Sequence, residues 1–317
     1  MIEITVKAGE KLQDAINALP KTDEEAVIYL GAGTFREKVV LDRANTTIVG
    51  EGAEQTRIVW GDGALEYMED IGKRGTFRTA TFRTDGSRIT LRSLTIENDA
   101  APREKAGQAI ALYVDGDFFT CEDCSLLGYQ DTLFTAPLPP KEFEKNGFIG
   151  PKQFAPRTPQ RHVYRRCYIR GDVDFIFGGA AAWFEDCDIV TKDGRTTQDA
   201  YQETYATAAS TPEGQKYGYV FNNCRFMGVN VPDGSVYLGR PWRAFARTIV
   251  MHSELGAHIH PAGWEIWGKP EFRDQGLYAE YQNEGPGTAG QRADFSRLLT
   301  DEEAAGITFE DFWKSLD

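Results

Sequence analysis

A short pattern built around cysteine recurs along this chain, and it constrains the possible fold more than any other feature. Residues 124–131 and 167–174 each read Cys, any residue, apolar residue, any residue, Gly, with an Asp seven residues after the Cys. Further copies of the core position lie at Leu94, Cys187 and Cys224, so that successive copies are 30, 43, 20 and 37 residues apart. Repetition of this kind is typical of a solenoid in which each copy forms one turn. The 20-residue interval suits one turn of a three-sided β-solenoid, and the longer intervals suit a turn plus a loop.

Short segments rich in β-branched and aromatic residues lie between these positions and are bounded by Gly, Asn and Asp, which predicts strands. They are Ala26–Leu30, Thr46–Val49, Arg88–Leu91, Gly218–Phe221 and Thr248–Met251. A β-sandwich would contain similar strands but would give no reason for Cys to recur at one phase. We therefore predict an all-β solenoid, a single domain over residues 1–317, with short helices at its ends.

Three segments indicate those helices. Lys11–Leu19 places apolar residues on one face and is expected to cover the N-terminal end of the solenoid. Thr300–Glu303 has the form of a capping box before a short helix at the other end. Thr308–Leu316 is expected to pack its aromatic residues onto the body. Between Ala136 and Gln160 the chain shows no strand pattern, and we expect this loop to form one wall of a cleft.

The chain has five cysteines, an odd number, so at least one is free or intermolecular. The cysteines of the repeat are expected to form a ladder of buried thiols, because Cys in a core behaves as a small hydrophobe. Cys121 and Cys124 form a CxxC pair, but positions three apart on a strand point to opposite faces, which argues against a redox pair.

The formal net charge of -13 argues against nucleic acid and anionic membranes as partners. No segment approaches the ~18 unbroken apolar residues of a membrane span. The chain begins without the basic and then apolar run of a secretory leader. We therefore expect a cytoplasmic protein, or a secreted one whose leader was removed before this numbering begins.

Asp131 and Asp174 stand at the same phase of the repeat. Stacked turns would hold them on neighbouring parallel strands about 4.8 Å apart. Two carboxylates that close rarely both ionise, so their pKa values separate and the pair divides into an acid and a base or nucleophile.

Several further segments surround these aspartates in the sequence. They are Gly33–Glu37, Gly107–Leu112, Gly128–Leu133, Asp174–Gly178, Leu238–Trp242, Gly263–Trp267 and Ala279–Gly287. With these segments in this order, nearly the whole chain closely resembles the pectin methylesterases, which demethylate homogalacturonan. Phe35 is a mild departure, because Tyr is more usual in that segment.

The resemblance implies a right-handed parallel β-helix and assigns roles to individual residues. It implies that Asp174 is the nucleophile on the C6 methyl ester and that Asp131 is the acid that protonates methanol and then the base that activates water. Gln108 and Gln130 resemble the side-chain oxyanion donors, and Arg240 resembles the residue that pairs with the nucleophile. The positions that resemble sugar contacts are Trp242, Phe177 and Val173.

These roles have a physical basis. A guanidinium beside Asp174 is expected to lower the pKa of that carboxyl by about 1–3 units and keep it ionised, while Asp131 keeps its proton. Gln donates to an oxyanion without adding a charge that would disturb the ion pair. We expect the substrate to be methyl-esterified homogalacturonan or its oligomers, with no metal and no cofactor, and the protein to be a monomer.

The sequence disfavours some other functions and leaves several open. A Ser hydrolase is disfavoured because no Gly-x-Ser-x-Gly segment exists, and the four His show no HExxH spacing for zinc. A calcium-dependent pectate lyase, a glycoside hydrolase and an esterase or thioesterase for another acyl substrate remain alternatives. A solenoid that only binds would leave the Gln, Asp and Arg set without a purpose.

Overall fold

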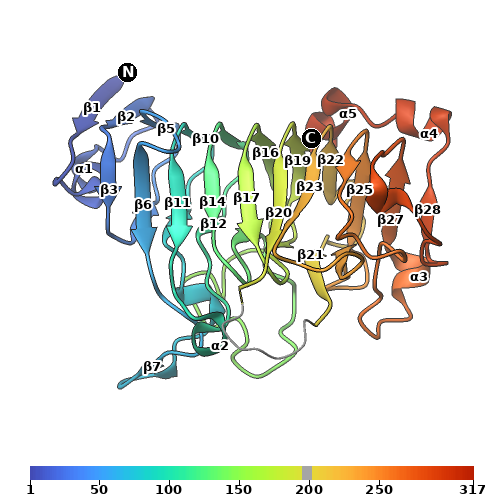
Figure 1. Ribbon diagram of the computed structural model, residues 1–317. Helices are drawn as coiled ribbons and strands as arrows, with labels where there is room; N and C mark the ends of the chain where they lie inside the picture. Colours follow the sequence, from blue (N-terminus) through green and yellow to red (C-terminus); the bar gives the residue numbers. More distant parts are fainter. Residues whose placement is uncertain (195–201) are drawn as a thin grey trace.

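The computed structural model describes residues 1–194 and 202–317, and in them the strands form three parallel sheets on three sides of a coil. Successive strands alternate among the sheets, as β10 (Ile89–Arg92), β11 (Thr95–Asn98) and β12 (Leu112–Val114) do. In the central coils, each coil therefore adds one strand to each sheet, whereas the first and last coils add strands mainly to one sheet. The molecule is a right-handed parallel β-helix (Figure 1), which confirms the predicted solenoid. That residues 1–317 form a single domain stays a prediction.

The sheets are numbered in the order in which the chain enters them. The first sheet contains β1 (Ile2–Val6), β2 (Ala26–Leu30), β5 (Thr46–Gly50), β10, β13 (Phe119–Glu122), β16 (Arg161–Arg165), β19 (Ala181–Glu185), β22 (Tyr219–Asn222), β25 (Arg247–Met251), β27 (Leu277–Tyr281) and β28 (Ser296–Leu298). The second contains β3 (Gly33–Phe35), β6 (Thr56–Trp60), β11, β14 (Ser125–Leu127), β17 (Tyr168–Gly171), β20 (Asp188–Lys192), β23 (Arg225–Val229) and β26 (Glu254–Leu255). The third contains β4 (Val39–Leu41), β9 (Phe82–Thr84), β12, β15 (Leu133–Thr135), β18 (Ile176–Gly178), β21 (Thr204–Ala209) and β24 (Val236–Gly239).

All five predicted strand segments are strands, and all five belong to the first sheet, as β2, β5, β10, β22 and β25. Their bounds differ from the prediction by at most one residue at either end. These strands are rich in β-branched and aromatic residues, and in β5 buried residues alternate with less buried ones.

The cysteines of the repeat form the predicted ladder. Cys124, Cys167, Cys187 and Cys224 each directly precede a strand of the second sheet, and these strands pair in register. All are buried free thiols. The residue before each of them has a positive φ between 51° and 54°, at the corner where the coil turns from the first sheet to the second. The corner keeps the same geometry from coil to coil, so a small buried side chain recurs after it.

One argument about Cys121 was wrong. Cys121 lies in β13 and Cys124 begins the next side of the coil, with Asp123 in a left-handed conformation between them. The two residues are therefore not on one strand, and both point into the core. Both are nevertheless free.

The glycine of the repeat has a steric cause. A Cβ at Gly171 would lie 2.1 Å from the Cβ of Phe175 and 2.5 Å from the carbonyl oxygen of Tyr129. A Cβ at Gly128 would lie 2.6 Å from the hydroxyl of Thr132. Glycine is therefore required where the chain turns sharply toward each of the two aspartates.

Stacked apolar residues fill the coil. Phe184 lies between Tyr164 and Phe221, with ring centroids 4.7 and 4.4 Å away and nearly parallel planes. Such stacks form because a residue of each coil lies directly above its counterpart in the coil below.

The N-terminal end is covered as predicted. Helix α1 (Leu12–Ala18) lies over the first coils, and Leu12, Ile16 and Leu19 are buried in the main core (Figure 1). At the other end, Phe272 of α3 (Phe272–Gln275) is buried in that core and packs on Tyr278, with ring centroids 4.4 Å apart.

Both helices predicted near the C-terminus are present, and the second packs its aromatic residues onto the body as predicted. The predicted capping box at Thr300 is present and begins α4 (Asp301–Ala305), which is followed by α5 (Phe309–Lys314). In α5, Phe312 packs on Trp183 of β19, and Asp311 pairs with Lys216 at 2.7 Å. The two helices run back along the outer face of the first sheet, because that face carries an apolar cluster that needs cover.

Residues 136–160 form the predicted strandless loop, inserted between β15 and β16. A further excursion is the short antiparallel hairpin of β7 (Tyr67–Met68) and β8 (Gly72–Lys73), which lies near α2 (Arg103–Ala106) in Figure 1. Two 3-10 turns, Thr76–Arg78 and Pro286–Thr288, complete the elements described.

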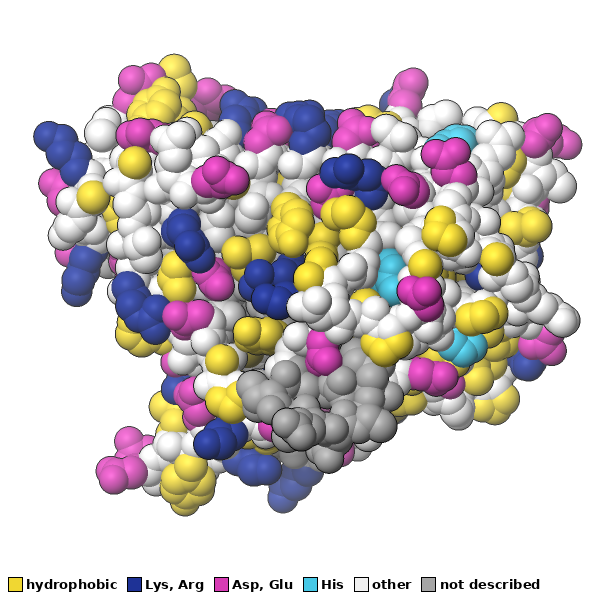
Figure 2. Space-filling view, viewed as in Figure 1, with side chains coloured by type: hydrophobic (Ala, Val, Ile, Leu, Met, Phe, Trp, Pro, Cys, Tyr) yellow, Lys and Arg dark blue, Asp and Glu magenta, His cyan; other side chains and the backbone are white. Residues whose placement is uncertain are grey.

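Charged side chains cover the face in Figure 2 with both signs interspersed. On the second sheet, Arg225 and Asp188 on neighbouring coils pair at 2.7 Å. Among the described residues, the helices are all too short or too polar to cross a membrane.

The buried ladder predicts the reactivity of the thiols. We expect the native protein to react with a water-soluble thiol reagent such as DTNB at a negligible rate, and all five thiols to react after unfolding in denaturant. A rapid reaction in the native state, or a total below five without reductant, would contradict this arrangement.

Candidate active site

Asp131 and Asp174 stand one above the other on neighbouring coils. They precede β15 and β18, whose pairing places Leu133 opposite Ile176 and therefore puts the two aspartates in register. The amide of Asp131 donates to the carbonyl of Val173 at 3.1 Å, and that of Asp174 donates to Tyr205 at 2.8 Å. Both have a positive φ, 64° and 48°, which Asp tolerates better than most residues. The predicted pairing of the two aspartates is confirmed.

Arg240 holds the Asp174 carboxylate with two hydrogen bonds. It follows β24, and its Nε and Nη2 donate to the two carboxylate oxygens at 2.9 and 2.6 Å. The planar guanidinium lies between the rings of Tyr205 and Trp267, at 3.8 and 3.7 Å from their centroids. This two-sided contact fixes the plane of the guanidinium, so the fork has one orientation toward Asp174.

The pKa values of the two carboxyls both rise, by different amounts. Burial and then the charge of Asp174 raise the pKa of Asp131 well above that of a free Asp. Burial also raises the pKa of Asp174, against the opposing effect of the hydrogen bonds and charge of Arg240. The expectation that the pKa of Asp174 is lowered was therefore wrong, because burial outweighs the guanidinium. Asp174 is still the carboxyl that ionises more readily, since Arg240 favours ionisation of Asp174 much more directly than that of Asp131.

Gln108 and Gln130 line the same cavity as the aspartates, a space of about 220 Å³. They lie on neighbouring coils, and the carbonyl of Gln130 accepts a hydrogen bond from Ala109 at 3.0 Å. Their backbones are thus part of the coil, while the side chains are half-buried at the cavity. Among the described residues, neither side-chain amide has a protein partner, so both are free to donate to a ligand.

The predicted sugar contacts fall into two places. Trp242 and Phe177 line the cavity, with ring centroids 5.7 Å apart, and belong to an aromatic cluster. Phe177 is buried, so most of its ring serves packing. Val173 lines a neighbouring space of about 310 Å³ on the other side of Arg240, together with Asp172.

Trp267 and Tyr205 contact Arg240 at the site, although neither was predicted from the sequence to be a site residue. Trp267 stood within a segment that carried the resemblance, but nothing in its spacing placed it over Arg240. Tyr205 carried no signal in the sequence. Gly147 of the 136–160 loop also lines the cavity, as expected for a wall formed by that loop.

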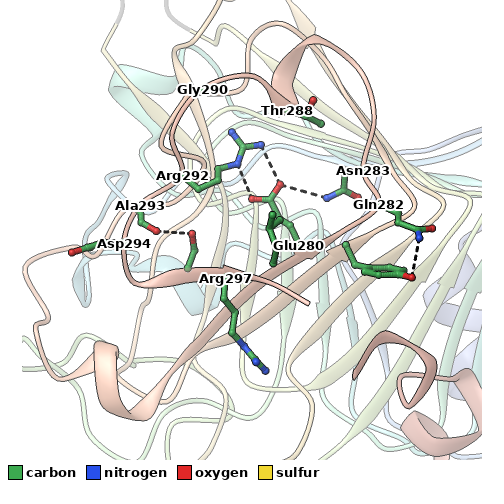
Figure 3. Close-up of a pocket in the computed structure, with 12 residues that line it drawn as sticks. Glu280, Gln282, Asn283, Thr288, Gly290, Arg292, Ala293, Asp294 and Arg297 are labelled. Carbon is green, nitrogen blue, oxygen red and sulfur yellow. Dashed lines mark hydrogen bonds and ion pairs between the residues drawn. The ribbon is translucent and has the colours of Figure 1, made fainter. Parts of the chain in front are cut away.

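A larger cavity of about 550 Å³ lies at the C-terminal end of the β-helix (Figure 3). Its centre is the buried carboxylate of Glu280, which accepts hydrogen bonds from Arg292 at 2.8 and 3.1 Å and from Trp264 at 3.1 Å. Arg292 also donates to two backbone carbonyls. These groups satisfy one another and tie the last coils together, so we interpret this cavity as structural.

In residues 1–194 and 202–317, no three His, Cys, Asp or Glu side chains are grouped as metal ligands would be. The cation in direct contact with the Asp174 carboxylate is Arg240.

Comparison with known proteins agrees with this geometry. The model of the family described as Pectinesterase matches residues 6–147 and 157–315. A pectinesterase of Petunia integrifolia is 32% identical over 88% of this chain and 68% of its own length. The probable pectinesterase/pectinesterase inhibitor 58 of Arabidopsis thaliana is 33% identical over 87% of this chain and 44% of its own length.

Among solved structures, a pectin methylesterase in complex with a hexasaccharide superimposes with a TM-score of 0.82 and 28% identity, over 98% of this chain and 96% of that one. The chain spans about half the length of several of the curated relatives that it matches. The family match covers most of the sequence, and we conclude that this chain belongs to the pectinesterase family.

Proposed function

We propose that this protein hydrolyses the C6 methyl esters of homogalacturonan or its oligomers, releasing methanol and free galacturonate. The observation that carries the proposal is one cavity that holds an in-register aspartate pair, a guanidinium on the second aspartate and two free amides. The relatives named pectinesterase and the pectin methylesterase bound to a hexasaccharide support this choice of substrate.

In the first half-reaction, the Asp174 carboxylate attacks the ester carbonyl carbon. The carbonyl oxygen becomes an oxyanion, to which the amides of Gln108 and Gln130 donate hydrogen bonds. Asp131, kept protonated by burial, donates its proton to the methoxy oxygen. The bond between carbon and that oxygen breaks, methanol leaves, and Asp174 is left as a mixed anhydride with the galacturonate.

In the second half-reaction, Asp131 is a carboxylate and accepts a proton from a water molecule that attacks the anhydride carbonyl. Asp174 departs as a carboxylate, which the fork of Arg240 stabilises. Asp131 is again protonated, and the site returns to its starting state. Each aspartate thus needs a different protonation state, which their different neighbours supply.

The proposal predicts methanol release from highly methylated pectin, unchanged by EDTA. Asp174→Asn should lower kcat by at least about a thousandfold, and Gln108→Ala or Gln130→Ala by about 10²–10³. Asp186→Asn is a matched control, because Asp186 also has a positive φ at a corner of a coil but is exposed. New reducing ends or unsaturated products without methanol would instead indicate a glycoside hydrolase or a lyase, and ligand binding without any turnover would indicate a binding module.

The pH profile of kcat/KM should be bell-shaped. Activity requires ionised Asp174 and is lost as pH falls through its pKa, which burial places above that of a free Asp, about 4. Activity also requires protonated Asp131 and is lost as pH rises through its still higher pKa. Initial rates measured across this range test both limbs, and a flat profile from about pH 4 to about pH 9 would contradict the assignment.

A carboxyl held protonated in a buried site also affects stability. Because the pKa of Asp131 is raised in the folded state, its contribution to stability is present at low pH and is lost as pH rises through that pKa. We expect Asp131→Asn to be inactive. Near neutral pH its free energy of unfolding should be about 0.5–2 kcal/mol higher than that of wild type, so that it unfolds at a higher temperature, and the gain should be smaller at pH 4. Asp70→Asn, at an exposed position, should show no pH-dependent gain in stability. An Asp131→Asn variant that is less stable than wild type at every pH would contradict this prediction.

A further inference from the structure

A third buried aspartate, Asp172, directly follows β17 and lies two residues before Asp174. Its side chain is 4% exposed and lines the space of about 310 Å³ on the other side of Arg240. This carboxyl group has no part in the proposed mechanism. Nε of Arg103, the first residue of α2, lies 3.0 Å from one of its oxygens. A buried carboxylate needs a cationic partner, and Arg103 provides it.

The ion pair joins the first and the third of three successive coils. Strands β12, β15 and β18 belong to these coils, and β15 pairs in register with both of the others. Arg103 precedes β12 and Asp172 precedes β18, so the pair spans the coil that carries Gln130 and Asp131. Adjacent parallel strands are about 4.8 Å apart, which makes the span about 10 Å. The ion pair therefore connects two coils that are not adjacent and share no strand pairing.

On the first coil, the link leads to Gln108. Helix α2 ends at Ala106, Gly107 turns the chain with a φ of 68°, and Gln108 follows directly. The amide of Gly107 donates to the carbonyl of Arg103 at 2.8 Å. The carbonyl of Gln108 accepts a hydrogen bond from Ala64 at 2.9 Å. Arg103 thus anchors the single helical turn from which Gln108 enters the cavity.

On the third coil, the backbone of Asp172 contacts the segment that carries the other amide. Its N–H donates to the carbonyl of Tyr129 at 3.2 Å, and Gln130 is the next residue. Asp172 therefore contacts the segments of both Gln108 and Gln130, and it is two residues from Asp174. A displacement of about 1 Å in a reacting geometry of this kind costs about a hundredfold in rate.

We propose that Asp172, paired with Arg103, is a positioning residue that holds the turn of Gln108 against the coil of Asp174, so that the Gln108 amide meets the oxyanion. This inference rests on the proposed function, which gives Gln108 its role. Among the described residues, neither Nε of Arg103 nor either carboxylate oxygen of Asp172 forms a hydrogen bond. The contact is therefore one of charge, and another cation at position 103 should replace Arg103.

The ion pair should depend on pH. Burial raises the pKa of Asp172 to about 7, the charge of Arg103 opposes this rise, and the charge of Asp193 adds to it. Glu104 and Lys105 of α2 are exposed. The other titratable or charged residues around Asp172 are Tyr129, Asp131, Glu203, Tyr205 and Arg240. Below about pH 7 the Asp172 carboxyl is protonated and the ion pair is lost, whereas above it the pair is present.

Methanol release from fully methylated pectin tests the positioning role. At about pH 8 we expect Asp172→Asn and Arg103→Met each to lower kcat about tenfold to a hundredfold, with KM changed less than about threefold. The double variant should lose no more than either single variant, because both remove one ion pair. Arg103→Lys should keep kcat within about threefold of wild type. Glu122→Gln is the matched control and should keep kcat, because it removes an ion pair with Arg92 on the first sheet.

Two further comparisons separate positioning from a purely structural role. The ratio of wild-type kcat to that of Asp172→Asn should fall toward 1 at about pH 5.5, where the wild-type pair is lost. In a Gln108→Ala background, Asp172→Asn should have little further effect on kcat at about pH 8.

Three results would overturn the positioning role. The first is an unchanged kcat in Asp172→Asn with only a lower unfolding temperature, which would mean that the pair merely stabilises α2. The second is a kcat ratio that is the same at both pH values, and the third is an undiminished effect of Asp172→Asn in the Gln108→Ala background. Each of these leaves the esterase function intact. If wild type releases no methanol, the proposed function is wrong, and the positioning role is wrong with it.

Discussion

Each coil of this β-helix hydrogen bonds to the coils before and after it, and the candidate site depends on the register that these bonds impose. The bonds continue past the ends of the strands, since the amide of Asp131 donates to Val173 and that of Asp174 donates to Tyr205. Many cooperative backbone hydrogen bonds and a buried side-chain ladder set the register. Their combined stability offsets the cost of holding two carboxyl groups close together. The scaffold thus supplies the preorganisation that the proposed chemistry needs.

Burial and charge then distribute protons within the pair. Both carboxyls are desolvated, so both pKa values rise, and only Asp174 has a guanidinium in direct contact with both oxygens. Tyr205 and Trp267 restrict that guanidinium from two sides. The aromatic contacts therefore act on the Asp174 carboxylate through Arg240, so residues on three different coils influence the ionisation of Asp174.

The charge of the protein is acidic overall but basic at one rim of the site. A net charge of -13 repels anions over a long range, whereas Arg243 and Lys269 attract them locally. Salt screens the long-range repulsion over about 8–10 Å, whereas it screens a direct contact with a half-buried cation less.

The sequence by itself determined the repeat, and with it the coil phase, the ladder from Cys124 to Cys224 and the pairing of Asp131 with Asp174, because one-dimensional periodicity maps directly onto stacking in a solenoid. Family resemblance supplied Gln108, Gln130 and Arg240. Tertiary structure decided what depends on burial or on distant contacts: the raised pKa of Asp174, the placement of Trp267 and Tyr205 around Arg240, and the choice of the first sheet as the surface that α4 and α5 cover. No periodicity encodes these, since desolvation depends on every neighbouring coil and loop, and side chains far apart in the chain meet only after the coils have stacked.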